Sequence, residues 1–492
     1  MKYSRTWRLY FMAMVATAIG IVQAQQPFDL DTTYRTQIER IYVNSVVPLP
    51  DGKAVISGRM VFPEYPFDEI LLAGLLANGS LDPDFEVSGL GGGKLVAWNN
   101  KYYVRGGNSV RRVGLDGSND LSFGISAGTV PYFSPAQGGD YHVYPDGGII
   151  LTGFHTLSDT VRGFEGTYNV IWFSNQGYLD TTATHRQCNG SIDFIHELPD
   201  GKFLLSGVYT TYEGQPAGRI LRVHPDGALD TTFNTSIFWG QAVGCHLLAD
   251  GRVLAAGRFQ LTGDPDTLHL IRLLPDGTLD PTFNNNLRSV YYSAGGLIPW
   301  SGLFPISDSS YVVYGGFSSV DEQVRVGIAA IDTAGQLLSS PFEGMGCDTF
   351  LYNGTTYGSI SRFVPDPVSG GYYICGAYRG YDDGSVNDTT QRMVSRLYGL
   401  DVGIGVSPSW QSPSLTLQPN PADGEVTIGY ENGTSRTAIT VRDITGREVF
   451  RKMAGATGKW LWDTSTLPAG TYVVTLLEEG SVRSARRLVV AR

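Results

Sequence analysis

Five aspartates occupy one repeated phrase, and their carboxyl groups are the first residues in the chain that could do chemistry. Each follows a glycine by three residues, as in ANGSLDPDF (77–85) and PDGTLDPTF (275–283). The five are Asp82, Asp120, Asp180, Asp230 and Asp280. Paired carboxylates can act as general acid and base or bind calcium. A catalytic pair need occur only once, so this recurrence predicts a structural role in which each carboxylate bonds backbone amides of a turn.

Three histidines also recur at matching positions. His142, His196 and His246 each lie four residues before the aspartate of an Asp-containing turn. If their strands face a common channel, they are weak candidates for a three-histidine metal site. The matching positions in the other repeats are Val47, Leu95, Phe304 and Pro365. These counterparts favour a packed, half-buried position, and no metal is predicted.

Longer segments between the repeated phrases are rich in aromatic and acidic side chains. Aromatic rings can stack on sugar rings while carboxylates accept hydrogen bonds from their hydroxyl groups. The candidate ligand-binding residues are Tyr65, Tyr209, Tyr212, Glu213, Asp264, Asp266, Tyr378, Tyr381, Asp382 and Asp383. The stretch from Asp382 to Asp388 offers oxygen ligands for calcium but lacks EF-hand spacing. A solvated loop is the favoured interpretation there, and no cofactor is predicted.

Composition and motifs narrow the function classes. The chain contains no HExxH, Walker loop, GxSxG or GxGxxG in a strand–helix setting, so no catalytic residue is predicted. Its formal net charge is −11, and loss of Lys2, Arg5 and Arg8 with a leader would make it −14. Such a charge repels phosphate backbones, which argues against nucleic acid as a partner.

The repeated phrases also predict the elements that carry these residues. A second phrase has the form turn, apolar strand, glycine, as in LPDGKAVISG (49–58) and LPDGKFLLSG (198–207). An Asp-Gly pair between apolar runs suits a tight hairpin. Each unit is therefore predicted to be a four-stranded antiparallel meander, with the LDxxF phrase as its short fourth strand. Seven such units in tandem predict a β-propeller.

The two ends of the repeat array predict how the ring closes. Residues 30–34 (LDTTY) form a fourth-strand phrase with no unit before it, whereas the seventh unit lacks a clear LDxxF phrase of its own. We therefore expect residues 30–34 to pair with the last unit, so that no sheet edge stays free. The Asp-Gly turns then emerge on one face of the ring. The longer connections emerge on the opposite face, roughly at 59–69, 155–167, 209–218, 259–267, 317–324 and 377–391.

Four regions follow from these patterns. Residues 1–24 have a basic start and an apolar stretch, as in a cleaved secretory signal peptide. Residues 25–402 are the predicted seven-bladed propeller, 403–413 a linker, and 414–492 a small C-terminal β-sandwich. The predicted fold class is thus all-β. No later stretch approaches the roughly 18 apolar residues of a membrane span.

Four cysteines stand in this predicted exported chain. Two disulfides, Cys188–Cys245 and Cys347–Cys375, are favoured by the proximity of their units, and buried free thiols are the alternative. No pair has CxxC or zinc-site spacing.

The GxLDxxF phrases, followed by turn-strand-glycine phrases, resemble the delta-60 repeat, a bacterial β-propeller family of largely undefined function. The resemblance spans about residues 30–402 and weakens in the last two units, where Leu337-Leu338 replaces Leu-Asp. Residues 414–492 resemble the type A C-terminal sorting domain of type IX secretion. This second resemblance is carried by Pro419, Asn420, Pro421, Gly446, Pro468, Gly470 and Tyr472. It implies Sec export, a type IX translocon as partner, removal of the tail near the linker, and a secreted or cell-surface location.

Three functions compete at this point. The favoured one is a non-catalytic propeller that binds a glycan, peptide or matrix component through the face with the longer connections. The alternative is a secreted polysaccharide hydrolase or lyase with loop carboxylates at the propeller mouth, which needs two converging carboxyl groups and a raised pKa. A purely structural module is the third.

Overall fold

The computed structural model describes residues 26–291, 300–399, 414–431, 437–443, 447–453, 458–478 and 481–491. The chain divides into two compact units, Met1–Val402 and Gly403–Arg492. The predicted signal peptide, all of the predicted linker and Gly446 lie outside the described residues. Within the described residues, no helix is long and apolar enough to cross a membrane.

The first unit is built from antiparallel sheets that follow one another in chain order, here called sheets 1 to 7. Sheets 1 to 3 are β1 (Glu39–Pro48), β2 (Ala54–Phe62) and β3 (Tyr65–Leu75); β4 (Gly92–Trp98), β5 (Lys101–Gly106) and β6 (Ser109–Gly114); and β7 (Phe133–Val143), β8 (Ile149–Asp159) and β9 (Phe164–Phe173). Sheets 4 and 5 are β10 (Ser191–Glu197), β11 (Phe203–Val208), β14 (Ile220–Val223) and β15 (Leu229–Asn234); and β16 (Ile237–Leu247), β17 (Val253–Leu261) and β18 (Leu268–Leu273). Sheets 6 and 7 are β20 (Gly302–Ser307), β21 (Ser310–Tyr314), β24 (Ile328–Asp332) and β25 (Leu337–Leu338); and β29 (Ser359–Pro365), β30 (Tyr372–Asp382) and β31 (Asn387–Leu397), with β26 (Gly346–Cys347) on the end of β30.

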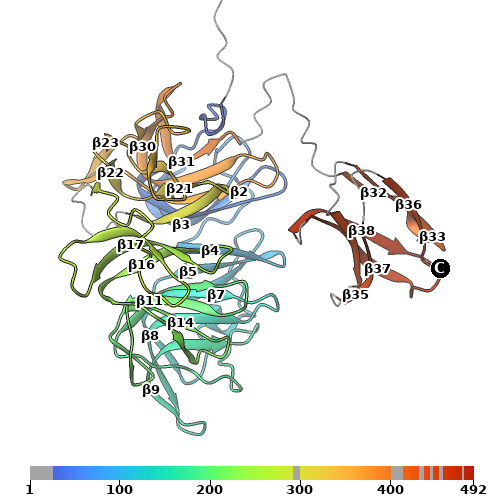
Figure 1. Cartoon of the computed structure of the whole chain (residues 1–492), viewed down its shortest axis with the longest axis horizontal. Coiled ribbons are helices and arrows are strands. Elements are labelled where there is room, and N and C mark those ends of the chain that lie inside the picture. The colour runs from blue at the N-terminus through green and yellow to red at the C-terminus, as the bar shows by residue number, and fades with distance from the viewer. Residues whose placement is uncertain are drawn as a thin grey trace, which may run out of the picture. The chain divides into compact units, whose positions relative to one another are not determined.

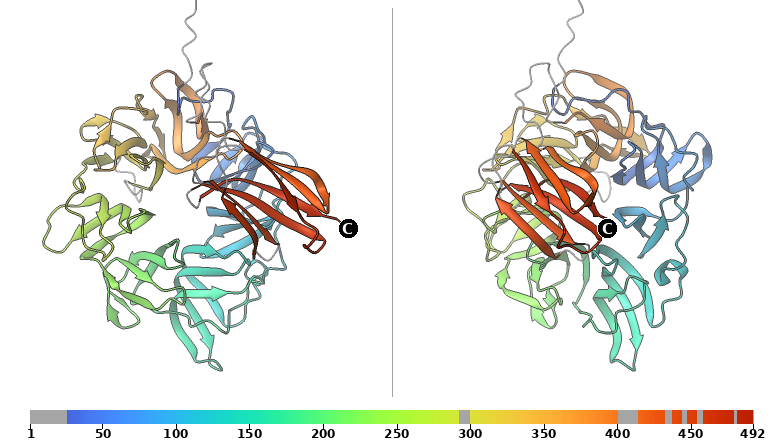
Figure 2. Two further views of the ribbon diagram at one scale, coloured as in Figure 1. Left: turned by 45° about the vertical axis from the view of Figure 1, so that its right-hand side comes forward. Right: turned by 90° about the vertical axis from the view of Figure 1, so that its right-hand side faces the viewer.

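Minor elements complete this unit. They are the short helix α1 (Gly124–Ala127) and three small sheets. Strand β12 (Thr211–Tyr212) pairs with β13 (Gln215–Pro216), and β27 (Phe350–Tyr352) pairs with β28 (Thr355–Tyr357). Strand β22 (Phe317–Val320) pairs with both β19 (Ser289–Tyr291) and β23 (Gln323–Val324). The sheets are arranged around a ring, and Figure 2 shows the blue N-terminal sheet beside the orange seventh sheet. The all-β propeller prediction is confirmed; the count of seven blades stays a prediction.

The predicted fourth strand forms only in part. The LDxxF phrase is a strand in sheet 4, where β15 pairs with β14. In sheets 1, 2, 3 and 5 it makes a single bridge to the third strand, such as Leu75 to Leu81 and Leu273 to Leu279. In both settings the aspartate carboxylate accepts the backbone N–H two residues later, as Asp280 does from Thr282 at 2.9 Å and Asp230 does from Thr232 at 3.1 Å. This local bond is therefore compatible with a bridge and with a paired strand.

The longer connections are also more regular than predicted. Residues 59–69 are the extended tip of the β2–β3 hairpin, whose strands are joined at Pro63 and Glu64. Residues 155–167 and 377–391 are likewise mostly the ends of β8, β9, β30 and β31. Irregular backbone is concentrated in 262–267, between β17 and β18. The backbone groups of most of these segments are thus satisfied by hairpin pairing.

The N-terminal segment pairs with sheet 7, as predicted. Leu30 forms an antiparallel bridge with Leu397 of β31. Phe28 N donates to Tyr398 O at 2.9 Å, and Asp31 N donates to Arg396 O at 2.8 Å. Tyr34 packs in one buried cluster with Val43 of sheet 1 and Tyr373 of sheet 7. The contact is a bridge with flanking hydrogen bonds rather than a full strand, yet it joins the two ends of the ring.

The second unit is a β-sandwich, as predicted. Strand β32 (Ser414–Asp423) pairs with β33 (Glu425–Glu431), which pairs with β36 (Gly458–Asp463). The end of β32 also meets β38 (Ser481–Val490), beyond which lie β37 (Gly470–Glu478), β34 (Thr437–Asp443) and β35 (Glu448–Met453). Both groups of strands contribute to one core that includes Val426, Val474 and Leu488. Figure 1 labels these strands, except β34, in the red part of the chain.

Candidate functional site

The repeated aspartates form ion pairs inside the sheets. In sheet 4, Asp230 accepts hydrogen bonds from Lys202 Nζ and Arg222 Nε, both at 2.8 Å. The Arg222 guanidinium lies over the Phe233 ring at 4.9 Å from its centroid. Burial alone would raise the pKa of Asp230, but its hydrogen bonds with Lys202, Thr232 and Arg222 outweigh burial and hold the pKa well below its usual value. The predicted structural role of these aspartates therefore accounts for Asp230.

The same arrangement recurs around the ring and links neighbouring sheets. Arg112 and Arg272 pair with Asp120 and Asp280 of their own sheets, at 2.6 and 2.7 Å. Each of these arginines also donates to a carbonyl in the turn of the next sheet, as Arg272 does to Thr333 O at 2.6 Å. In sheets 2, 4 and 5 the LDxxF aspartate thus binds an arginine that joins one blade to the next, whereas Asp82 of sheet 1 pairs with Lys53 and Asp180 of sheet 3 accepts from Thr182.

The closing contact repeats this arrangement with residues from opposite ends of the repeat array. Arg396 of β31 donates to Asp31 Oδ2 from Nε at 2.7 Å, and its guanidinium lies over Tyr34 at 5.1 Å. Its Nη1 donates to Ala77 O of the first sheet's turn at 3.4 Å. We call Arg396, Asp31, Thr33 and Tyr34 the closing latch, and Arg222, Asp230, Thr232 and Phe233 the sheet 4 latch.

The three candidate histidines pack against aromatic rings. His142 lies edge-on to Tyr144 at 4.9 Å, and His246 lies 6.0 Å from Tyr311. His196 stacks on Phe194 at 6.2 Å. Burial lowers the pKa of His142 to about 4, with Lys94 as a further cause. Among the described residues, no three His, Cys, Asp or Glu side chains are grouped so that they could hold a metal ion, so the half-buried interpretation fits these positions.

Four of the predicted ligand-binding tyrosines are buried, which is a correction. Tyr209, Tyr212, Tyr378 and Tyr381 are each at most 2% exposed. Their hydroxyl groups serve the fold; Tyr212, for example, donates to Gly227 O at 2.7 Å, and Tyr378 donates to Ser395 Oγ at 2.8 Å. These rings close the outer ends of the sheets and present no face to a ligand. Tyr65 is 38% exposed and stays a candidate.

Most of the acidic candidates take part in local structure. Glu213 accepts the backbone N–H of Gln187 at 2.6 Å. Asp382 accepts from Gly384 N, and Asp383 from Ser385 N and from Leu30 N at 2.6 Å. Asp383 therefore helps to hold the N-terminal segment. Asp264 accepts from Asp266 N, which leaves the carboxylate of Asp266 as the one with no hydrogen bond or ion pair within the described part of the chain.

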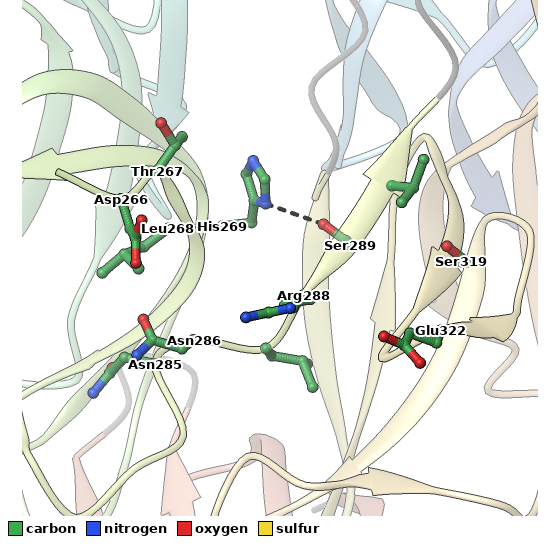
Figure 3. Close-up of a pocket in the computed structure, with 12 residues that line it drawn as sticks. Asp266, Thr267, Leu268, His269, Asn285, Asn286, Arg288, Ser289, Ser319 and Glu322 are labelled. Carbon is green, nitrogen blue, oxygen red and sulfur yellow. Dashed lines mark hydrogen bonds between the residues drawn. The ribbon is translucent and has the colours of Figure 1, made fainter.

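Asp266 lines a pocket of about 570 Å³ between sheets 5 and 6. The pocket lies between two of the predicted longer connections, 259–267 and 317–324. Its lining is Asp266, Thr267, Leu268, His269, Asn285, Asn286, Leu287, Arg288, Ser289, Val290, Ser319 and Glu322. Figure 3 shows Asp266, Thr267 and His269 on one side, Ser319 and Glu322 on the other, and Arg288 between them. We call this the sheet 5–6 pocket.

The polar groups of this pocket are of two kinds. His269 Nδ1 is 3.0 Å from Ser289 Oγ, which also accepts from Trp300 Nε1 at 2.9 Å, so this side is fixed by hydrogen bonds. Burial, with Arg258 nearby, lowers the pKa of His269 to about 4, so the ring is neutral near pH 7. The side chains of Asp266, Arg288 and Glu322, by contrast, have no ion pair or hydrogen bond within the described residues. These two carboxylates and one guanidinium are thus available to a ligand.

Asp266 was a candidate from the sequence, and Glu322 lies in the predicted connection 317–324, but the other lining residues were not predicted. Arg288 and Ser289 follow the LDPTF phrase in the polar run NNNLRS (284–289), a signal that could have been noticed. His269 stands in an ordinary strand, and only the neighbouring sheet makes it part of a pocket. Nothing in its local sequence distinguishes it.

A second polar pocket, of about 280 Å³, lies where the first strands of the sheets meet. Lys94 pairs with Asp140 at 3.0 Å, and Arg105 donates to Gly138 O at 2.8 Å. Asp193 accepts from Ser191 Oγ, and burial raises the pKa of its carboxyl group. Its charges are largely paired within the protein, unlike those of the sheet 5–6 pocket.

The four cysteines are free thiols, so the favoured disulfide pairs are wrong. Cys188 Sγ donates to Gly190 O, and Cys347 Sγ donates to Val326 O. Burial raises the pKa of Cys188 to about 11 and of Cys375 to about 12, which keeps the thiols protonated and unreactive. The structure supports the alternative, free thiols, of which Cys347 and Cys375 are buried and Cys188 and Cys245 are half-buried.

Three of the sorting residues make hydrogen bonds within the second unit. Asn420 Oδ1 accepts from Val489 N at 2.9 Å, and Tyr472 OH donates to Pro468 O at 2.8 Å. Asp443 and Arg447, on either side of the sorting residue Gly446 in sequence, bond each other through backbone and side chain. These contacts fix the ends of β32, β37 and β38.

The first unit is thus a β-propeller, and the second is a β-sandwich. Residues 198–233 and 248–283 match the family model described as a domain of unknown function (DUF5122) beta-propeller. Residues 416–491 match the secretion system C-terminal sorting domain. Both resemblances found in the sequence are thereby confirmed. The sorting domain makes this a secreted or outer-surface protein that is handled by the secretion system.

Solved structures give distant matches. One is PorZ of Porphyromonas gingivalis, a surface component of its type IX secretion system, at 11% identity and a TM-score of 0.36 over 91% of this chain and 59% of that one. Another is the extracellular domain of BT4673 from B. thetaiotaomicron, at 9% identity and a TM-score of 0.38 over 96% and 59%. This chain thus spans less than two thirds of either. A comparison with curated proteins finds no match.

Proposed function

We propose that this protein is a non-catalytic ligand-binding propeller of the cell surface or secretome, and that it binds a glycan in the sheet 5–6 pocket. The observation that carries the proposal is the set of charged side chains, Asp266, Arg288 and Glu322, that line this pocket without partners in the described chain. Carboxylates accept sugar hydroxyl groups, and a guanidinium donates to ring and hydroxyl oxygens. The pocket volume of about 570 Å³ lies within the range of small-ligand sites.

A glycan fits this lining better than an apolar ligand does. Leu268, Leu287 and Val290 are the apolar members, and the remaining lining residues are polar or charged. An exported protein meets polysaccharides and glycoconjugates, and the sorting domain accounts for its export. Peptide and matrix ligands share the same polar chemistry and are outcomes of the test below.

The test is a glycan array and a peptide array probed with the purified protein. Wild-type protein should retain a defined glycan, and Arg288→Gln or Glu322→Gln should each weaken its binding about tenfold, the loss of one charge-assisted hydrogen bond. Glu64→Gln, at an exposed hairpin tip in sheet 1, is the control and should bind as wild type. Binding that is unchanged in all three variants would move the site elsewhere.

The competing hypothesis, a polysaccharide hydrolase or lyase, predicts turnover of the retained glycan. Product release followed by chromatography separates the two, since a binding module leaves the glycan intact. The only carboxyl groups with raised pKa among the described residues are those of Asp29, Asp193 and Asp348, and none lines the sheet 5–6 pocket.

A further inference from the structure

A second groove lies between sheets 4 and 5, on the edge formed by β11, β14, β16 and β17. It has a volume of about 250 Å³ and is lined by Val208, Arg219, Trp239, Gly240, Gln241 and Arg258. Large apolar side chains are exposed here: Val208 by 55%, Phe238 by 53% and Trp239 by 40%. Exposed apolar side chains that lie together, as these three do, indicate a binding surface.

Two arginines frame this indole. The Arg258 guanidinium lies over the Trp239 ring, 4.9 Å from its centroid. Arg219 Nε donates to Phe238 O at 3.0 Å, which fixes its guanidinium beside the groove. The lining contains no acidic residue, and Arg258 has no hydrogen-bond acceptor within the described part of the chain. Two cations therefore stand here without a carboxylate, in a protein of net charge −11.

The equivalent groove between sheets 1 and 2 shows what is special about this one. Arg59 follows Gly58 in the second strand of sheet 1, as Val208 follows Gly207 in sheet 4 and Arg258 follows Gly257 in sheet 5. In the sheet 1–2 groove, however, Glu69 accepts from Arg59 Nε at 3.1 Å and from Nη2 at 2.7 Å. Arg59 is thus paired with a carboxylate inside that groove, and Arg105 of the same lining donates to Gly138 O at 2.8 Å. In the sheet 4–5 groove, Val208 stands at the repeat position of Arg59, and the cations Arg219 and Arg258 have no carboxylate beside them in the lining.

We propose that the sheet 4–5 groove binds an acidic sugar residue, with the pyranose ring on Trp239 and its carboxylate or sulfate on Arg219 and Arg258. An aromatic ring provides the flat apolar contact that the C–H face of a sugar requires. Guanidinium groups bind carboxylate or sulfate by charge-assisted hydrogen bonds. The volume suits one sugar ring rather than an extended ligand. This site stands on residues separate from the sheet 5–6 pocket and does not depend on the function proposed for that pocket.

The experiment is isothermal titration of the full-length protein with three oligosaccharides of equal length: an oligogalacturonate, a sulfated galacto-oligosaccharide and the neutral galacto-oligosaccharide. At least one acidic oligosaccharide should bind about tenfold more tightly than the neutral one. This preference should weaken as salt is raised from 0.05 to 0.5 M, roughly, because exposed charges are screened. The two acidic arms distinguish carboxylate from sulfate.

Variants then locate the site. Trp239→Ala should reduce acidic-sugar affinity about tenfold or more, and Arg258→Gln should remove the preference for acid over neutral sugar. Phe154→Ala is the matched control, since Phe154 follows Gly153 at the same repeat position in sheet 3, is 39% exposed, and should change nothing. Circular dichroism confirms that each variant is folded.

Three results would overturn the proposal: equal binding of acidic and neutral sugars, full acidic-sugar affinity in Trp239→Ala, or a concentration-dependent dimer that Trp239→Ala abolishes. The last would assign the groove to a second copy of the chain. If Glu322→Gln loses sugar binding while Trp239→Ala binds as the wild type does, only the sheet 5–6 pocket is supported. The two proposals can therefore fail separately.

Discussion

The sheet 4 latch and the closing latch use the same phrase, LDTT followed by an aromatic residue, in two topological settings. In sheet 4, Asp230 follows its arginine by eight residues, whereas in the closing latch Asp31 and Arg396 are 365 residues apart. The contacts are nevertheless alike: a carboxylate on Arg Nε, a hydroxyl group on the same carboxylate, and an aromatic ring beneath the guanidinium. The difference teaches that the repeat is a connector, which works equally within one sheet and between the ends of the ring.

The largest expected effect comes from removing the two aromatic rings of the N-terminal segment, Tyr34 of the closing latch and the nearby Phe28. Phe28 and Tyr34 are buried at 2% and 0% exposure. Truncating both to alanine should lower the free energy of unfolding by about 6 to 10 kcal/mol, at about 3 to 5 kcal/mol for each ring. That loss rivals the total stability of a typical domain, about 5 to 15 kcal/mol. Thermal unfolding followed by circular dichroism should show a much lower Tm or no cooperative transition.

The control for this variant truncates two buried residues at the sheet 4 latch, Phe233 and Ile237. It should also destabilise the protein, but hydrogen exchange should rise first in β11 to β18. In the Phe28→Ala, Tyr34→Ala variant, exchange should rise first in β1, β30 and β31. Identical exchange patterns in the two variants would show that the ring is not closed by the N-terminal segment.

The next effect concerns the carboxylates of the two latches. Asp230→Asn leaves Lys202 and Arg222 without their anion and should cost about 3 to 5 kcal/mol, as for a broken buried ion pair. Asp31→Asn affects one cation, and the Arg396 side chain is 18% exposed, so the cost should be smaller, about 1 to 3 kcal/mol. Urea titration measures both. A larger loss for Asp31→Asn would mean that closing the ring depends on its charge more than on its packing.

The repeat made both latches predictable in part. The LDTTY phrase at residues 30–34 indicated where the ring closes, because similar phrases elsewhere in the chain follow the third strand of a repeat unit. The arginines were not predicted, although Arg112, Arg222 and Arg272 each precede their aspartate by eight residues. Arg396 has no such partner in sequence, and only the ring brings it to Asp31. A sequence pattern can reveal an ion pair between residues that are close in the chain. An ion pair between distant residues, such as Asp31 and Arg396, can be identified only from the fold.

The candidate site was less predictable for a related reason. Aromatic content in the longer connections suggested ligand contacts at Tyr212 and Tyr378, but a tyrosine at a hairpin end can cap the core as readily as meet a ligand. Exposure depends on the neighbouring sheet, which the sequence does not display. The sheet 5–6 pocket and Trp239 lie between sheets for the same reason, and composition alone could not locate them.

Acid should release the closing latch before the sheet 4 latch. For Asp31, burial favours the protonated form, but hydrogen bonds from Thr33 and Arg396 outweigh it and lower the pKa from 3.8. Asp230 has a second cation, Lys202, and its pKa is held further below that value. A carboxylate with a lowered pKa stabilises the fold above its unfolded pKa, and this contribution is lost as pH falls through the folded pKa.

Hydrogen exchange between pH 4 and pH 2, roughly, with rates corrected for intrinsic exchange, tests this order. Protection at Leu30 and Asp31 should fall at a higher pH than protection at β14 and β15. In Asp31→Asn the closing segment should already be less protected at pH 7, and its protection should depend less on pH in this range than in the wild-type protein. Simultaneous loss at both latches in the wild-type protein would contradict the proposed role of Lys202.

The smallest expected effect distinguishes the two aromatic residues. The Tyr34 hydroxyl is buried and has no hydrogen-bond partner, whereas sheet 4 has phenylalanine at the same place. A buried hydroxyl group without a partner costs about 1 to 3 kcal/mol of desolvation. Tyr34→Phe should therefore stabilise the protein, by about 1 kcal/mol after loss of some packing, and Phe233→Tyr should destabilise it. The urea midpoints of the two variants, compared with that of the wild-type protein, test both predictions. A destabilised Tyr34→Phe would mean that the hydroxyl group has a partner, most simply a water molecule, and that the closing latch is wetter than its counterpart in sheet 4.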